Sequence, residues 1–233
     1  YHYASLQAVN AMFSRVYLYM ENWEQALAYA QRAIAGQPLA QGNDYLRMFS
    51  DLSYQGEAIF RLSGQDRRGY LRAFYESSCV PADTLISLFD ADDIRLSLLR
   101  KAGSNHCSKY SATTVPDNDV NRDDPFVFRL SEMYLNAAEA ACELRQYGVA
   151  RQYVGAILAR AVGQDKAEAR LAACSDAHNL FDITRWKQNL VREQHTTSTL
   201  KRLNYPNDRF VLPIPQTELN ANTNMKGNPT VNQ

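Results

Sequence analysis

Small side chains recur at helical spacing near the start of the chain, and this pattern restricts the fold more than any other feature of the sequence. Residues 8–38 predict two helices joined by a short turn, in which Asn22 caps the second helix and Gly36 and Pro38 end it. Alanines on one face of the second helix allow the two helices to approach closely. The segment is therefore predicted to form a helical hairpin.

The spacing of these residues matches the tetratricopeptide pattern. The matching positions are Ser14, Tyr17, Ala26, Ala30, Ala33 and Pro38. Residues 126–163 predict a second, more degenerate hairpin, with Ala138 and Ala141 at the close-packing positions. The two hairpins do not form a regular solenoid, because residues 39–125 lie between them and consecutive repeats must stack directly.

The intervening residues 39–125 have a different character, with scattered glycines and aromatic residues. They predict an irregular, loop-rich insertion whose best strand is residues 58–62. Residues 164–233 predict a further helix and an extended tail, since Pro213 and Pro215 are incompatible with a helix. The predicted fold class is mainly α, with tetratricopeptide-like helical hairpins and a loop-rich insertion, within one domain over residues 1–233.

Charge and motif content exclude several classes of function. The chain has 25 basic and 25 acidic residues, so no net positive charge favours nucleic acid. The sequence has no nucleophile elbow, Walker loop, dinucleotide motif or zinc-protease motif, so we expect no catalysis and no cofactor. Glycosidase carboxylates meet only in space, which leaves a glycoside hydrolase as a distant alternative.

We also predict no metal site. Asp117, Asp119 and Asn121 alternate like the first half of a calcium loop, but position six is Arg122 and position twelve is Phe128. The four histidines are too dispersed in the sequence to indicate a cluster.

The cysteines and several charged residues are expected to have structural roles. Cys142 and Cys174 lie in alanine-rich stretches and are predicted to be small buried side chains. Cys79 and Cys107 are expected to form a disulfide only if the protein occupies an oxidising compartment. Glu132 and Glu139 lie on one helical face and are expected to pair with Arg129 or Arg185 inside the scaffold. Asp182, Arg185 and Trp186 are interpreted as a second scaffold network.

The order of motifs resembles the SusD/RagB family of nutrient-binding outer-membrane lipoproteins of Bacteroidetes. The similar segments are residues 11–27, 44–49, EAIF at 57–60, 93–95, RLSEMYLNAAEA at 129–140, LFDITRW at 180–186 and FVLPIPQTE at 210–218. One departure is Asn179, where the family has an arginine. The helical pattern already present at Tyr3 and the family's longer chains imply an N-terminally truncated sequence, with the lipid-bearing cysteine upstream of Tyr1.

The resemblance implies non-enzymatic binding of an oligomeric nutrient, most simply a glycan, and its delivery to a SusC-like TonB-dependent transporter. It also implies a surface-exposed location on the outer membrane, reached through a lipid anchor. The alternatives are a RagB-like peptide-binding protein and a plain tetratricopeptide scaffold for protein partners.

The ligand is expected to contact the insertion. Aromatic rings stack on sugar rings while arginine donates hydrogen bonds to hydroxyl groups, and a tyrosine ring tolerates exposure because its hydroxyl stays solvated. The predicted ligand-binding residues are Tyr70, Arg72, Tyr75 and Tyr110. Phe74 is predicted to point toward the core instead.

Overall fold

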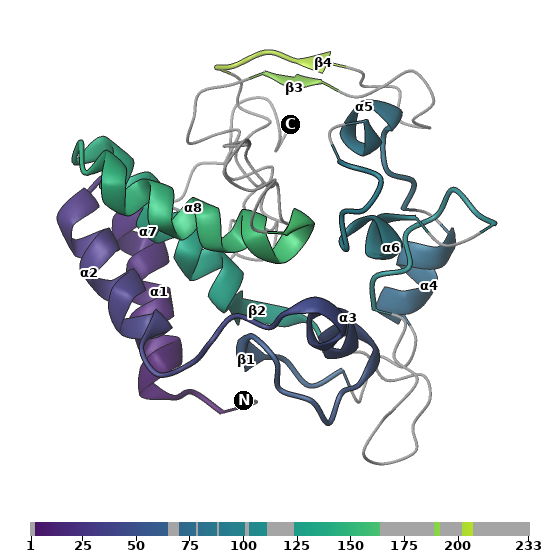
Figure 1. Cartoon of the computed structure of the whole chain (residues 1–233), viewed down its shortest axis with the longest axis horizontal. Coiled ribbons are helices and arrows are strands. Elements are labelled where there is room, and N and C mark those ends of the chain that lie inside the picture. The colour runs from purple at the N-terminus through teal and green to yellow at the C-terminus, as the bar shows by residue number, and fades with distance from the viewer. Residues whose placement is uncertain are drawn as a thin grey trace, which may run out of the picture. The chain divides into compact units, whose positions relative to one another are not determined.

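The computed structural model describes the greater part of the chain in two compact units, residues 1–172 and residues 173–233. The described residues are 3–64, 70–77, 79–87, 89–100, 103–110, 124–163, 189–191 and 202–206. Figure 1 shows the elements of the first unit, which is mainly helical, so the predicted fold class is confirmed.

The first helical hairpin consists of α1 (Leu6–Tyr19) and α2 (Trp23–Ile34). Ser5 caps α1 by accepting a hydrogen bond from the backbone N–H of Ala8 at 3.1 Å. Asn22 caps α2 as the sequence predicts, since its side chain accepts from the N–H of Gln25 at 3.3 Å.

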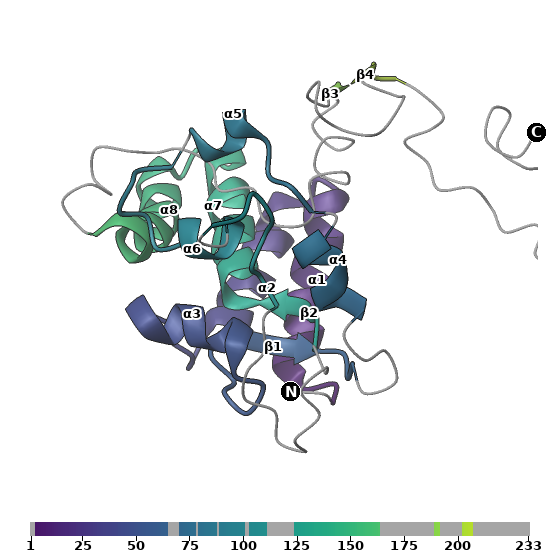
Figure 2. The same ribbon diagram turned by 90° about the vertical axis from the view of Figure 1, so that its right-hand side faces the viewer.

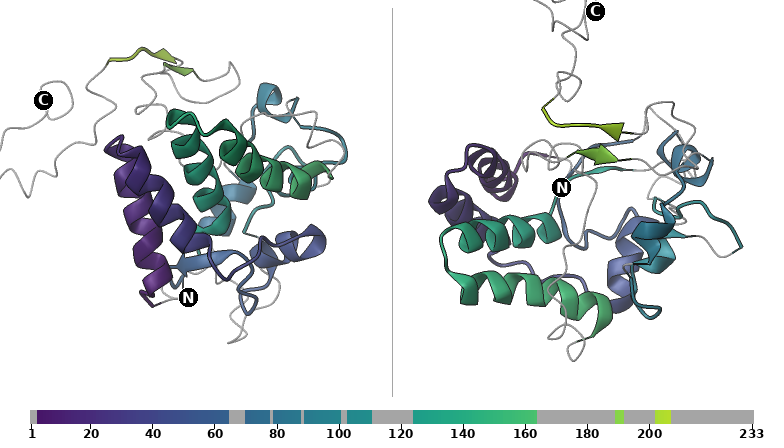
Figure 3. Two further views of the ribbon diagram at one scale, coloured as in Figure 1. Left: turned by 60° about the vertical axis from the view of Figure 1, so that its left-hand side comes forward. Right: turned by 90° about the horizontal axis from the view of Figure 1, so that it is seen from above.

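The second helical hairpin consists of α7 (Leu130–Glu143) and α8 (Tyr147–Val162). It packs on the first hairpin through α2 and α7, as the two views of Figure 3 also show. The contact is built from alanines that are almost fully buried, Ala26, Ala30, Ala137, Ala140 and Ala141. Small side chains let the two helix backbones approach closely, as the tetratricopeptide-like pattern predicts.

Ser14 shows why one position of the pattern must be small. Its side chain is fully buried and its hydroxyl donates to the carbonyl oxygen of Ala26 at 3.2 Å, across the first hairpin. The amide of Asn136 on α7 donates in turn to the Ser14 hydroxyl at 3.3 Å. One buried serine therefore links three helices.

Two short strands join the insertion to the scaffold, β1 (Ala58–Arg61) and β2 (Phe126–Arg129). Figure 2 shows the two strands side by side, and they pair antiparallel. Ala58 lies opposite Arg129 and Arg61 lies opposite Phe126. The predicted strand at residues 58–62 is thus confirmed over most of its length.

The insertion holds more helix than the loop-rich pattern indicates. It contains α3 (Gly42–Ser50), α4 (Tyr70–Ser77), α5 (Asp83–Ile86) and α6 (Leu96–Leu99). Tyr45, Met48 and Phe49 of α3 form a small core of their own, against which Ile94 and Leu98 pack. Because α3 and α6 are short, their stability comes from that core rather than from their own hydrogen bonds.

The described part of the second unit is a two-stranded hairpin of β3 (Leu190–Val191) and β4 (Arg202–Leu203). The backbone N–H of Tyr205 donates to the Asn189 side chain at 2.8 Å. The predicted scaffold network of Asp182, Arg185 and Trp186 and the prolines at 213 and 215 lie outside the described residues. Within the described ranges, every helix is too short or too polar to cross a bilayer.

Candidate functional site

Two of the predicted ligand-binding residues meet in the structure. The ring of Tyr75, on α4, lies 5.3 Å from the ring of Tyr110, centroid to centroid. Tyr70 and Arg72 are on the same helix, but their side chains lie outside the part that the structure describes. Whether these four residues bind a ligand stays a prediction.

Phe74 differs from its prediction, because its side chain is 49% exposed rather than directed to the core. Successive residues of a helix are rotated by about 100°, so Phe74 and Tyr75 cannot share one direction. Tyr75 takes the inward direction toward Tyr110, and Phe74 is left at the surface. The two rings make an edge-to-face contact at 5.8 Å.

Phe74 and Tyr75 end a continuous row of aromatic rings that begins in the core of the insertion. The aromatic row consists of Tyr45, Phe49, Phe126, Tyr110, Tyr75 and Phe74, with neighbouring centroids 5.3 to 6.3 Å apart. These separations are in the range for favourable edge-to-face and offset contacts. The aromatic row includes buried rings, such as Phe49 with 2% exposed, and ends at Phe74, which is 49% exposed.

Cationic side chains line the aromatic row. The guanidinium carbon of Arg61 lies 4.2 Å from the Phe126 centroid, and that of Arg129 lies 5.5 Å from Phe49. Lys109 places its Nζ 5.3 Å from the Phe49 centroid and 5.8 Å from Tyr110. Each cation faces the negative side of a ring, which stabilises the row and keeps positive charge beside it.

Tyr110 supports the site from inside rather than from the surface. Only 9% of the residue is exposed, and its ring packs against Phe49, 6.1 Å away, as well as against Tyr75. The expectation of an exposed tyrosine ring is wrong at this position. Its backbone has a φ of +65°, a conformation that bulky residues rarely adopt, so the ring contacts must hold it there.

A buried ionic cluster of Glu57, Ser131 and Arg160 joins the helical scaffold to the start of β1. Arg160 on α8 donates to the carboxylate of Glu57, and Ser131 on α7 donates to the other oxygen of that carboxylate. Arg160 also donates to the Ser131 hydroxyl at 2.9 Å. The guanidinium lies over the ring of Tyr45, the first member of the aromatic row, at 4.3 Å.

Glu132 has a partner that the sequence did not indicate. Its carboxylate binds Arg15 of α1, with Nε to Oε1 at 2.6 Å and Nη2 to Oε2 at 2.7 Å. The predicted partner Arg185 lies outside the described residues. Arg15 also donates to the carbonyl oxygen of Val127 at 2.7 Å. This ion pair joins the first hairpin to β2 and α7 and has a structural role.

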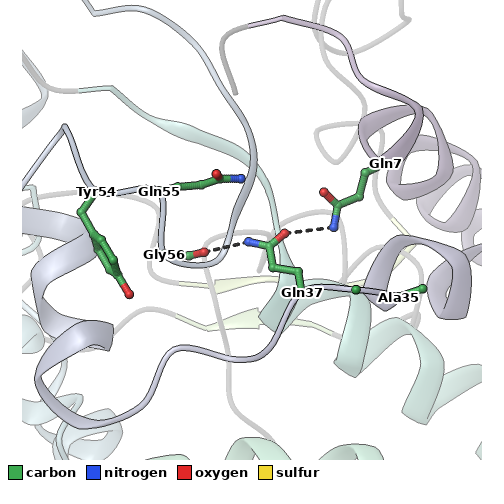
Figure 4. Close-up of a pocket in the computed structure, with 7 residues that line it drawn as sticks. Gln7, Ala35, Gln37, Tyr54, Gln55 and Gly56 are labelled. Carbon is green, nitrogen blue, oxygen red and sulfur yellow. Dashed lines mark hydrogen bonds between the residues drawn. The ribbon is translucent and has the colours of Figure 1, made fainter.

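A second surface feature is a polar hollow of about 450 Å³. It is lined by Gln7, Ala35, Gly36, Gln37, Tyr54, Gln55 and Gly56, and Figure 4 shows the amides of Gln7 and Gln37 pointing toward one another. Gln7 donates to Gln37 at 3.0 Å, and Gln37 donates to the Gly56 carbonyl at 2.7 Å. These amide groups bond the chain to itself, so the hollow serves first as a contact between α1, the end of α2 and the loop before β1.

The remaining predictions concern cysteines and metals. Cys142 is exposed and not buried, because it lies on the outer face of α7 near its end. Cys174 and the calcium-like segment at Asp117, Asp119 and Asn121 lie outside the described residues. The described ranges contain no group of acidic, histidine and cysteine side chains able to hold a metal ion.

Sequence reasoning missed Phe74 and Lys109. Residues 70 and 74 are one turn apart in an eight-residue helix, and this spacing is the signal that would have placed them on one face. No local signal identifies Lys109, since its position depends on how a loop folds against α3.

Comparison with known proteins agrees with this architecture. The sequence model of the SusD family matches residues 90–174. No curated protein sequence matches the chain. A SusD superfamily protein from Bacteroides thetaiotaomicron shares the fold with a TM-score of 0.79 at 22% identity, over 97% of this chain and 61% of its own length.

Two further solved structures are similar. A SusD-like carbohydrate binding protein from Bacteroides vulgatus gives a TM-score of 0.71 at 20% identity, over 96% of this chain and 60% of that protein. Surface glycan-binding protein A from Bacteroides thetaiotaomicron, in complex with laminarihexaose, gives 0.66 at 15% identity, over 98% and 64%. The chain therefore spans about three fifths of the length of these proteins. The family match over residues 90–174 and the shared fold agree with the resemblance seen in the sequence.

Proposed function

We propose that the chain binds an oligosaccharide at the exposed end of the aromatic row, around Phe74 and Tyr75. The observation that carries this proposal is that the row extends from a rigid core to an exposed phenylalanine ring beside a half-buried tyrosine. A ring held in place by others behind it loses little conformational freedom when a ligand stacks on it. Tyr70 and Arg72 belong to the proposed site through their positions on α4.

The chemistry of the site suits a sugar ligand. The C–H face of a sugar ring packs on an aromatic face, and nearby cations such as Lys109 donate hydrogen bonds to hydroxyl groups. Two of the similar solved structures are described as carbohydrate-binding or glycan-binding proteins, and one contains laminarihexaose. This supports a glycan as the ligand.

The biological role that we propose is nutrient capture without catalysis. The protein would hold an oligosaccharide at the outer surface of the cell and deliver it to a SusC-like TonB-dependent transporter. A lipid anchor on a cysteine upstream of Tyr1 would retain it on the outer membrane. These three statements rest on the family resemblance, and copurification of the full-length protein with a TonB-dependent transporter tests the central one.

Titration calorimetry of single-site variants tests the binding proposal. Laminarihexaose and a panel of other neutral oligosaccharides are the probes. Phe74→Ala and Tyr75→Ala should each weaken binding of the active oligosaccharide five- to tenfold, because loss of one stacking ring removes about 1 kcal/mol. Tyr147→Ala is the matched control, since this tyrosine is 63% exposed at the start of α8 and outside the aromatic row.

The outcome separates the alternatives. Equal affinity in both α4 variants would place the ligand site elsewhere in the protein. Binding of unstructured peptides but of no oligosaccharide would favour the RagB-like alternative. A folded protein partner bound through the helical hairpins, with no small ligand, would favour a tetratricopeptide scaffold.

A further inference from the structure

The side chains of Cys79 and Cys107 lie together in the insertion. Cys79 follows the last described residue of α4, and Cys107 lies in the segment that ends at Tyr110. The two thiols are near enough for each to shift the pKa of the other, and the Cys107 thiol donates to the carbonyl oxygen of Leu98 at 2.9 Å. Their backbones are also joined, since the N–H of Cys107 donates to the carbonyl oxygen of Cys79 at 3.0 Å.

This geometry suits a disulfide. Residues paired by backbone hydrogen bonds in an antiparallel ladder have Cα atoms about 5.5 Å apart, which lies within the roughly 4.4–6.8 Å that a disulfide needs. The mutual influence of the two thiols on their pKa values agrees with this backbone proximity. Oxidation therefore needs no large movement of either backbone.

We propose that Cys79 and Cys107 form a disulfide that closes the insertion onto itself when the protein meets a disulfide oxidant. This goes beyond ligand binding and does not depend on it. The bridge would join the end of α4 to the loop that carries Lys109 and Tyr110, and so fix the contact between Tyr75 and Tyr110.

The reaction is a thiol–disulfide exchange with an oxidant R–S–S–R, either a protein oxidase or a small disulfide. Cys79, the more exposed of the two, attacks one sulfur of the oxidant and expels a thiolate RS⁻. Cys107 then attacks the sulfur of Cys79 and expels the second RS⁻. The two cysteines lose two electrons and two protons in total, and the oxidant leaves as two thiols RSH.

The two thiols of the reduced pair ionise differently. A hydrogen bond from Cys79 lowers the pKa of Cys107 to about 7, against the opposing effect of burial. The same hydrogen bond, together with burial, raises the pKa of Cys79. In the reduced pair Cys107 is therefore the sulfur that is partly a thiolate at neutral pH. Once Cys79 has reacted, its S–H no longer donates to Cys107, so the second step relies on the proximity of the two residues.

Mass spectrometry of the whole 233-residue chain tests the proposal. The reduced protein is incubated with oxidised glutathione, denatured in an alkylating reagent, and digested without reduction. We expect the peptides that contain Cys79 and Cys107 to be joined, with both sulfurs protected, while the exposed Cys142 is alkylated. The melting temperature of the oxidised chain should be higher than that of the reduced chain, because the closed loop lowers the conformational entropy of the unfolded state.

Two variants serve as controls. Cys142→Ser should retain the joined peptides and lose only its own alkyl group. Cys79→Ser should leave Cys107 alkylated and remove the redox-dependent shift in melting temperature. Alkylation of both Cys79 and Cys107 in the oxidant-treated wild-type chain would overturn the proposal, as would a link from either residue to Cys142, Cys174 or glutathione.

Discussion

Arg160 and Glu57 form an ion pair in the interior of the protein although they are 103 residues apart in the sequence. Only 3% of the arginine side chain and none of the glutamate side chain is exposed. The pair joins α8 to the residue that precedes β1, so one interaction connects the helical scaffold to the insertion.

Replacing one member of this pair should destabilise the protein strongly. Arg160→Leu leaves the Glu57 carboxylate buried without its cation, which costs about 3–5 kcal/mol in other proteins. Urea unfolding followed by circular dichroism measures the loss. Arg151→Ala, an exposed arginine on the same helix, should change the free energy of unfolding by less than about 0.5 kcal/mol.

A double variant makes this prediction specific. Glu57→Gln combined with Arg160→Met removes both charges, so it should be less destabilising than the sum of the two single changes. A strictly additive result would mean that the two side chains do not stabilise each other.

Arg15 should not tolerate replacement by lysine. Its guanidinium binds both oxygens of Glu132 and the Val127 carbonyl, and lies 4.2 Å from the Phe128 ring. A lysine offers a point charge and cannot reproduce this planar, two-pronged geometry. Arg15→Lys should therefore lower the free energy of unfolding by about 1 kcal/mol, as measured by chemical denaturation. Stability equal to that of the wild type would show that charge alone accounts for the interaction.

Gly56 should be the least replaceable of the described glycines. Its φ is +54°, and an added Cβ would lie 2.7 Å from the Cβ of Met48, which is fully buried. Gly56→Ala should thus combine backbone strain with a steric clash and reduce stability by about 3 kcal/mol.

Two other glycines provide matched comparisons. Gly36 also has a positive φ, of +82°, but an added Cβ meets nothing within 4 Å, so Gly36→Ala should cost only the strain, about 1 kcal/mol. Gly155 lies inside α8 with open space around it, and Gly155→Ala should stabilise the protein by about 0.5–1 kcal/mol. Thermal melting of the three variants should reproduce this order; a Gly56 variant as stable as the Gly36 variant would contradict the predicted clash.

Asp51 should make stability depend on pH in the acidic range. Burial raises the pKa of this carboxyl, but hydrogen bonds from Ser53 and Arg47 outweigh burial, so the pKa lies below its usual value of 3.8. The contribution of Asp51 is therefore complete above pH 3.8 and is lost as the pH falls through the lower pKa of the folded state.

Asp51→Asn isolates this effect. The difference in unfolding free energy between the wild type and this variant should be constant near neutral pH and shrink below pH 3.8. Ser53→Ala, which removes a 2.5 Å hydrogen bond to the same carboxylate, should reduce the size of the change. A difference that grows as the pH falls would show the opposite shift.

The helical scaffold was predictable because its signals are local. Asn22 and Gln25 mark a helix start through their spacing alone, and Ala26 and Ala30 mark the face that must pack closely. Ser14 follows from the same repeat, since a larger side chain would separate two helices.

The site was harder to predict, because its residues are placed by contacts between distant segments. Phe74 and Tyr75 are adjacent in the sequence, and which of them faces inward depends on Tyr110, which arrives from another loop. Glu132 finds Arg15 across 117 positions, and no spacing rule relates them. Composition indicated an aromatic ligand region, but not which rings reach the surface.

The pairing of β1 with β2 holds together the two ends of the segment that runs between residues 61 and 126. Since the two ends are held side by side whatever lies between them, a change in the length of this segment mainly alters the entropy of loop closure, by about 0.6 kcal/mol for a doubling in length. The segment between β1 and β2 can therefore change in sequence and length, in evolution or by design, while the helical hairpins remain the same.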